Sequence, residues 1–268
     1  MVFLRRSWLL LAISQSFSQA SSAPGVVEVD LIFPRNDTFA PSKLTPIVFA
    51  IQNPSLVQSI NPVLSWNIEQ RGVSANDSIN TSDLFHLSSL NYSNSDPYFL
   101  YESTSHLDSE GFFQFAWTIE YSNCSQDAGT DAVTFARNST RHSLYFTTKN
   151  GTSQRDLIAA TEDNTCAQSL SQAWNVTNLL NVPDEKSYGG APSCAVVPSP
   201  TATPSPCKVK ISPSAASSIS AALTSYACAA PSPQVSCPAA KNAASGTQLP
   251  VGGAWLTAIV GWLAYTLA

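Results

Sequence analysis

The chain has 268 residues, of which 12% are charged and 44% hydrophobic, and its formal net charge is −5. A typical soluble domain carries about 25% charged residues, so this composition does not suit a cytosolic enzyme kept in solution by Lys and Glu. All 18 acidic residues lie between Glu28 and Glu185, and no basic stripe is present to neutralise phosphates. The composition therefore argues against nucleic acid as a partner.

Residues 1–23 have the three-part layout of a secretory signal peptide. Arg5 and Arg6 precede an apolar stretch from Trp8 to Ile13, and small polar residues follow. The stretch is far shorter than the roughly 20 residues that span a bilayer. We expect cleavage after Ala20 or Ala23.

Residues 24–182 are predicted to form an all-β domain, an immunoglobulin-like antiparallel sandwich. Trp66 on the third strand suits the core of such a domain, although no cysteine precedes Cys124 to form the disulfide of antibody domains. Turn-forming Asn, Asp, Ser, Pro and Gly clusters separate seven β-rich runs, which are Val26 to Phe33, Pro46 to Pro54, Pro62 to Gln70, Tyr98 to Ser103, Gly111 to Cys124, Asp131 to Ala136 and His142 to Gly151.

The following residues are predicted to be less strand-like. Apolar residues at helical spacing favour one short helix within 156–173. Residues 183–206 are Pro/Ser/Thr-rich and are expected to form a linker that buries no core. Residues 207–241 are expected to form a small segment clipped by cysteines, partly helical between Ser212 and Ala230.

Residues 242–268 have the pattern of a GPI attachment signal, which is removed from the mature protein. The tail from Val251 to Ala268 holds no charged residue, and small residues with a short polar spacer precede it. Counting back from the tail places the attachment site at Asn242, with Ser245 and Gly246 as alternatives. A true transmembrane tail is the competing interpretation, disfavoured by its glycines and by the lack of flanking charge.

Asn-X-Ser/Thr is the strongest repeated signal in the sequence. Behind a signal peptide it predicts surface N-glycosylation, and the sugars would supply hydration that the few charges do not. Asn123 is the doubtful site, because the adjacent Cys124 is expected to form a disulfide. The eight candidate sites are Asn36, Asn76, Asn80, Asn91, Asn123, Asn138, Asn150 and Asn175.

An even number of cysteines in an oxidising compartment predicts three disulfides. Six cysteines allow 15 connectivities, and sequence cannot choose among them. Proximity favours Cys124 with Cys166, and two bonds among the remaining four. A metal site is disfavoured because no C-x-x-C is present and no histidine lies near a cysteine. The cysteines are Cys124, Cys166, Cys194, Cys207, Cys228 and Cys237.

We find no catalytic pattern in the sequence, and we expect neither an enzyme nor a bound cofactor. A serine hydrolase would need a G-x-S-x-G elbow, which is absent. A glycosidase would need two acids across a cleft, but the candidates fall in loops or on strands, where solvated acids are expected. Those acids are Asp108, Glu110, Glu120, Glu162 and Asp163, and His86, His106 and His142 have no triad context.

Aromatic residues leave one binding role open. Phe113, Phe115 and Trp117 alternate on one strand face, which predicts a sandwich core. Tyr98 and Tyr101, beside an Asn-rich loop, are the candidates for glycan contact.

The segments VVEVDLIFPRNDTFAPSKLTPIVFAIQNP, VLSWNIEQ and CKVKISPSAASSISAALTSYAC resemble a fungal family of secreted, often GPI-anchored proteins built on a domain of unknown function. The resemblance implies a place on the outer face of the plasma membrane or in the cell wall, and it carries no catalytic residues. We therefore expect a GPI-anchored surface glycoprotein with a structural or interaction role, whose partners are the membrane through the GPI lipid and cell-wall polysaccharide or surface proteins. The alternatives are a carbohydrate-binding module of the wall and, less favoured, a wall-modifying hydrolase.

Overall fold

Strands are the main regular secondary structure in a computed structural model that describes residues 24–74, 78–92, 95–130, 132–163, 165–166, 168–182 and 188–238. Residues up to 236 form one compact unit, and of the second unit, residues 237–268, only 237 and 238 are described. The predicted signal peptide, the GPI signal with Asn242, Ser245 and Gly246, and the candidate site Asn76 lie outside the described residues.

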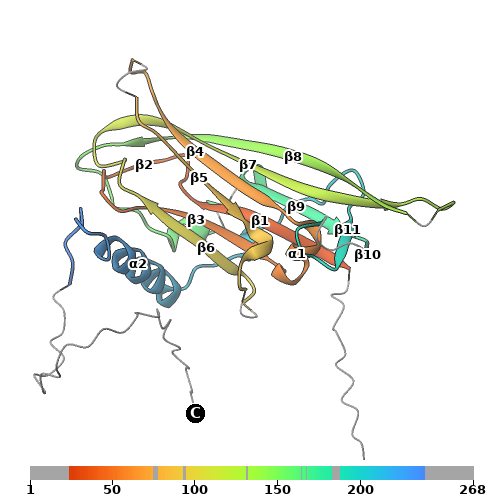
Figure 1. The fold of residues 1–268 in the computed structure, drawn as a ribbon. Helices are drawn as coiled ribbons and strands as arrows, with labels where there is room; N and C mark the ends of the chain where they lie inside the picture. Colours follow the sequence, from red (N-terminus) through yellow and green to blue (C-terminus); the bar gives the residue numbers. More distant parts are fainter. Residues whose placement is uncertain are drawn as a thin grey trace, which may run out of the picture. The chain divides into compact units, whose positions relative to one another are not determined.

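One sheet has four strands in the order β6-β3-β1-β9, all paired antiparallel (Figure 1). Its central strand β1 is buried on both faces. The strands are β1 (Gly25–Phe33), β3 (Thr45–Gln52), β6 (Tyr98–Thr104) and β9 (Ser171–Val176).

The second sheet has five strands in the order β2-β8-β7-β4-β5. Only the short β2 pairs in parallel, with the end of β8. A two-stranded sheet of β10 and β11 completes the strands. Their bounds are β2 (Thr38–Phe39), β4 (Val63–Arg71), β5 (Asn80–His86), β7 (Gly111–Gln126), β8 (Val133–Thr148), β10 (Asn178–Asn181) and β11 (Ser193–Val196).

The main core lies between the two larger sheets, which face each other. Phe49 on β3 contacts Phe115 and Trp117 on β7, with ring centroids 6.4 and 5.6 Å apart. Phe113, Phe115 and Trp117 are at most 1% exposed, which confirms their prediction as core. Alternation of side chains along each strand gives every inner face its apolar residues.

Three predicted elements differ in the structure. The two runs that begin at Asp131 and His142 contribute to one strand, β8, which covers Val133–Thr148, while Asp131 itself is not described. In place of a helix within 156–173, the chain makes two 3₁₀ turns, Ala159–Thr161 and Gln168–Leu170, and then enters β9. Strand β9 is buried on nearly every residue, so its sequence lacks the alternation that indicates a strand. Other short helices are Pro54–Leu56, α1 (Val57–Ile60), Leu87–Ser89 and Pro206–Lys208.

The helix predicted near the C-terminus is confirmed as α2 (Pro213–Cys228). Ser212 caps it by accepting a hydrogen bond from the Ala215 N–H (3.2 Å), and a proline occupies its first turn. Ile219 and Leu223 on α2 are buried in the main core. Figure 1 shows α2 on the side of the four-stranded sheet that faces away from the five-stranded sheet.

By contrast, the described part of the predicted linker, residues 188–206, contributes buried residues to the core. Cys194, Ala195 and Val197 are at most 3% exposed. The Ser205 N–H donates to both carboxylate oxygens of Glu28, at 2.7 and 2.9 Å. Buried side chains, main-chain hydrogen bonds and the Cys124–Cys194 disulfide therefore anchor this segment to the β domain.

The favoured disulfide, Cys124 with Cys166, is wrong. Cys124 bonds to Cys194, and Cys166 bonds to Cys207. The reason is topological, since β11 lies against β7 and brings Cys194 to Cys124. Cys228 and Cys237 are also disulfide-bonded, and no described cysteine is free.

Candidate functional site

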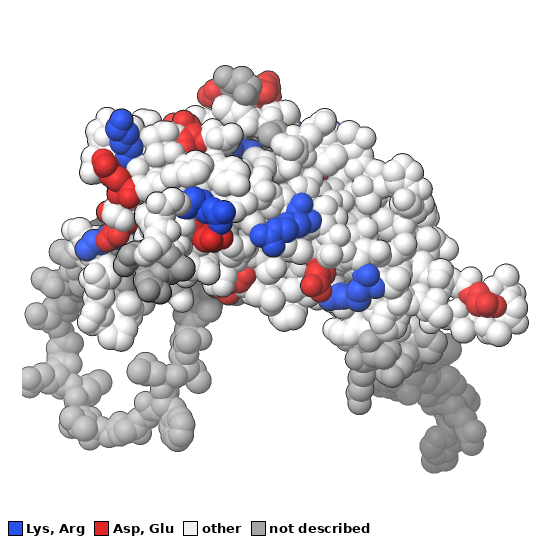
Figure 2. All heavy atoms as spheres, turned by 90° about the horizontal axis from the view of Figure 1, so that it is seen from above, with Lys and Arg blue, Asp and Glu red and all other residues white. Residues whose placement is uncertain are grey.

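The outer face of the five-stranded sheet is the candidate binding face. The polar positions of β4, among them Ser65, Asn67 and Glu69, turn away from the core because Leu64, Trp66 and Ile68 turn into it. The molecule seen from above presents a mostly uncharged surface with scattered acidic and basic side chains (Figure 2). Such a face suits a neutral polar ligand better than a highly charged one.

Two aromatic rings stack on this face in solvent. Phe112 on β7 and Tyr145 on β8 are 48% and 43% exposed. Their ring centroids lie 5.4 Å apart with 14° between the planes. The register explains the pair, because Gln114 lies opposite Tyr145 and Phe112 is two residues away on the same side of β7. These two exposed, nearly parallel rings form an apolar platform against which the apolar face of a sugar ring can pack.

Polar groups flank the platform on the neighbouring strand β4. Arg71 lies opposite Phe112, and Glu69 lies opposite Gln114. Arg71 and Glu69 form an ion pair with 2.7 Å between Nη1 and Oε1, so the pair offers both donors and acceptors at little net charge. A hollow of about 410 Å³ opens beside them, lined also by Gly72 and Asn80.

Tyr98 and Tyr101, the candidates for glycan contact, do not form such a platform. They are three residues apart on β6, so their side chains leave opposite faces of the strand. Tyr98 is half-buried with its ring edge-on to Tyr92 (4.9 Å between centroids), whereas Tyr101 is 36% exposed.

The acids considered for glycosidase chemistry are dispersed. Glu110 accepts a hydrogen bond from the Asn150 N–H (2.7 Å), and Glu120 lies 3.7 Å from Arg137 in an ion pair. Asp108 is exposed in a loop. None of these three carboxylates faces another across a cavity in the described part of the chain.

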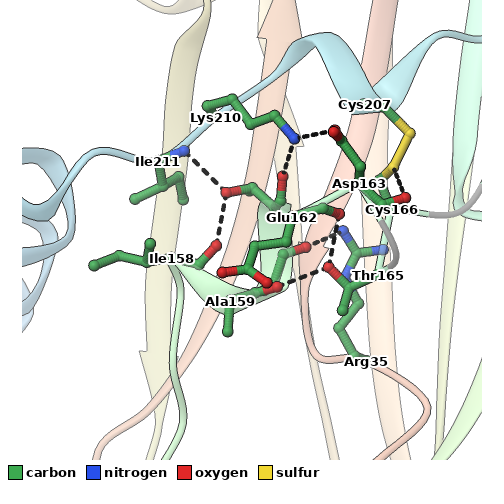
Figure 3. A network of polar contacts seen from close by, with 12 residues as sticks. Arg35, Ile158, Ala159, Glu162, Asp163, Thr165, Cys166, Cys207, Lys210 and Ile211 are labelled. Atoms are coloured by element: carbon green, nitrogen blue, oxygen red, sulfur yellow. Dashed lines mark hydrogen bonds and ion pairs between the residues drawn. A yellow bond between two sulfur atoms is a disulfide. The ribbon is translucent and has the colours of Figure 1, made fainter.

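Glu162 and Asp163 line a shallow hollow, but Asp163 belongs to a structural clasp (Figure 3). Lys210 Nζ donates to Asp163 Oδ1 (2.5 Å) and to the carbonyl of Thr161 (2.8 Å). The Ile211 N–H donates to Thr161 Oγ1 (3.0 Å), and the Cys166–Cys207 disulfide closes the same clasp. The clasp fixes the loop after β8 to the segment that leads into α2.

The sequence did not indicate two pairs of neighbouring carboxyl groups, and in each pair one carboxyl has a raised pKa. Glu102 on β6 is hydrogen-bonded to Asp83 on β5, and the Trp66 indole N–H also donates to it. Burial, followed by Asp83, raises the pKa of Glu102 to about 8. Carboxyls that share a hydrogen bond lie closer together than the about 5 Å between the two acids of a retaining glycosidase.

The other pair, Glu28 and Asp30, is buried on β1 beneath Ser205. Burial and then Asp30 raise the pKa of Glu28 above its ordinary value. The E-x-D spacing on β1 is the sequence signal for this pair, and it does not indicate that a later segment covers the two carboxyls.

The histidines stay apart. His86 and His106 are exposed, while the His142 ring stacks on Trp117 (4.3 Å) and its Nδ1 pairs with the Ser169 carbonyl (3.0 Å). Burial lowers the pKa of His142. Among the described residues, no three His, Cys, Asp or Glu side chains gather to hold a metal ion.

Six of the candidate glycosylation sites carry an exposed asparagine, and they are Asn36, Asn80, Asn91, Asn138, Asn150 and Asn175. Asn123 differs, because it is half-buried and its Oδ1 accepts a hydrogen bond from the Val197 N–H (2.8 Å).

Together these features define a mostly β, disulfide-bonded protein with an open polar sheet face. Its described helices all fall short of the length and apolar character that crossing a membrane requires. The chain belongs to the family described as "Domain of unknown function (DUF7136)", which it matches over residues 22–237. The match includes both larger sheets, α2 and all six cysteines. No curated protein and no solved structure matches the chain.

Proposed function

We propose that this chain is a secreted N-glycoprotein of the fungal cell surface, held on the outer leaflet by a GPI lipid and acting by binding rather than by catalysis. The observation that carries the proposal is the exposure of every described candidate asparagine except Asn123. Glycosylation requires surface sites and passage through the secretory route, and the disulfides fit an oxidising compartment.

Peptide mapping of the full chain from a secretory host tests this proposal. We expect occupancy at most of the exposed sites, and release of the sugars by an N-glycosidase should lower the mass accordingly. A chain that enters the medium or the membrane without N-glycans would contradict it.

We also propose that the two larger sheets are of the immunoglobulin type. The order β6-β3-β1 corresponds to strands E-B-A, and the order β5-β4-β7-β8 corresponds to C′-C-F-G of that fold. The chain departs from it by adding β9 beside β1 and by joining Cys124 to Cys194. An experimental structure that places β6, β3 and β1 in another order would refute the assignment.

The Phe112–Tyr145 platform favours a second candidate function, the binding of neutral wall polysaccharide. The test is co-sedimentation of the full chain with insoluble β-glucan and with chitin. We expect Phe112→Ala with Tyr145→Ala to weaken binding at least about tenfold. Leu84→Ala is the matched control, because Leu84 is 49% exposed and points to the same side of the sheet from β5. Equal binding by the double variant and wild type would remove the platform from this role.

A further inference from the structure

A cavity of about 580 Å³ lies between the segment that follows β1 and the loop that follows β8. Its volume is in the range of small-molecule sites. Buried Phe33, Phe39 and Leu170 give it apolar walls, and Arg35 and Arg155 bring two guanidinium groups. The cavity is separate from the Phe112–Tyr145 platform and shares no residue with it.

Neutral acceptors position both arginines. Arg35 Nη2 donates to the Ala160 carbonyl (2.9 Å). Arg155 Nη1 donates to the Ala40 carbonyl (3.2 Å) and to Thr45 Oγ1 (3.4 Å). The ion pairs found among the described residues involve neither arginine.

Burial lowers the pKa of each guanidinium, and for Arg35 the nearby buried Asp30 partly offsets this. Asp30 accepts its hydrogen bond from Gln52 and not from Arg35. Arginine stays charged at neutral pH, so two guanidinium groups line the cavity and neither is hydrogen-bonded to a carboxylate.

The acids on the cavity wall are already engaged. Asp156 Oδ1 accepts from the N–H groups of Ile158 and Ala159, at 2.9 and 3.1 Å. Asp37 Oδ1 accepts from the Thr38 N–H (2.7 Å). By contrast, Nε and Nη1 of Arg35 are buried with no acceptor. A buried donor without an acceptor is costly, so these two N–H groups favour a ligand that brings oxygen acceptors.

The wall that carries Ala160 is held in place before any ligand arrives. Thr165 Oγ1 donates to the carbonyls of Ala159 (2.7 Å) and Glu162 (2.9 Å), and the clasp of Lys210 and the Cys166–Cys207 disulfide ties the same loop down (Figure 3). A site that is fixed in advance loses less entropy when a ligand binds.

We propose that this cavity binds a small organic carboxylate. The carboxylate pairs with Arg35, after a small turn of its guanidinium, and with Arg155, while the apolar body of the ligand lies along Phe33, Phe39 and Leu170. A guanidinium offers paired N–H donors that match the two oxygens of a carboxylate. The apolar walls distinguish an organic acid from a bare inorganic anion.

The test is calorimetric titration with benzoate and hexanoate of the full chain carrying Asn36→Gln, because Asn36 lines the cavity and this change keeps its wall free of a glycan and of a new charge. We expect saturable binding with Kd of about 1 mM or tighter for at least one acid. Benzyl alcohol and inorganic phosphate should bind at least about tenfold more weakly. Benzyl alcohol lacks the carboxylate, and phosphate lacks the apolar body.

Arg35→Gln and Arg155→Gln should each weaken that binding at least about tenfold. Arg141→Gln removes the same charge from an exposed position on β8 outside the cavity and should leave binding unchanged. Thermal unfolding checks that each variant is folded, and Arg35→Lys, which keeps the charge and loses the paired donors, replaces Arg35→Gln if that variant unfolds. No saturable binding of either acid up to about 10 mM, equal binding of phosphate, or equal weakening by Arg141→Gln would overturn the proposal.

Discussion

Removal of the Cys166–Cys207 disulfide tests whether the residues after 182 belong to the β domain or form a separate stalk. The bond joins residues 41 positions apart, and for a loop of this length the chain-entropy relation gives a stabilisation of about 4 kcal/mol. Neither cysteine is fully buried, so the change adds little cavity cost. We therefore expect Cys166→Ala with Cys207→Ala to lower the free energy of unfolding by about 4 kcal/mol, a large share of the 5–15 kcal/mol typical of a domain.

Urea unfolding measures this change, and Asp163→Asn is the matched control in the same clasp. Its ion pair with Lys210 is exposed, so its loss should cost about 1 kcal/mol or less. If residues 183–206 were instead a free linker, a protease would cut there without unfolding the β domain. In that case the double variant would unfold with nearly the wild-type free energy, and the reasoning would be refuted.

Three further predictions concern burial and protonation. Native Glu102 keeps a proton to about pH 8 that the unfolded chain loses near pH 4.5, so stability should fall as pH rises between these values. Glu28, whose pKa is also raised by burial, contributes to the same fall, so Glu102→Gln should reduce the drop in melting temperature across that window without abolishing it. Leu223→Ala should cost about 2–5 kcal/mol in urea unfolding if α2 is part of the main core. Asn123→Gln should leave the glycoprotein mass unchanged, whereas Asn138→Gln, at an exposed site on the adjacent strand, should remove one glycan; a shift with the first and none with the second would contradict the burial argument.

Strands can be predicted well from the sequence where one face is buried and the other is exposed to solvent. β4 is such a strand, since its inner residues alternate with half-buried polar ones. β5 escaped prediction because it is an edge strand with mostly exposed residues on both faces. β9 escaped for the opposite reason, because burial on both faces leaves no period of two.

Long-range geometry limited the prediction of the site. Phe112 breaks the alternation of Phe113, Phe115 and Trp117, which places it on the outer face of β7. Its partner Tyr145 follows only from the register between β7 and β8, which no local pattern fixes. The arginine cavity is likewise assembled from segments more than 100 residues apart, as the bond from Arg35 to Ala160 shows.

The central claim, a surface glycoprotein held by a GPI lipid, is tested most directly by treating membranes from cells that express the full chain with phosphatidylinositol-specific phospholipase. We expect release of the glycoprotein into the soluble fraction. A chain ending at Lys241 is the control and should reach the medium without treatment. Retention of the full chain in the membrane after treatment would contradict the claim and favour a transmembrane tail.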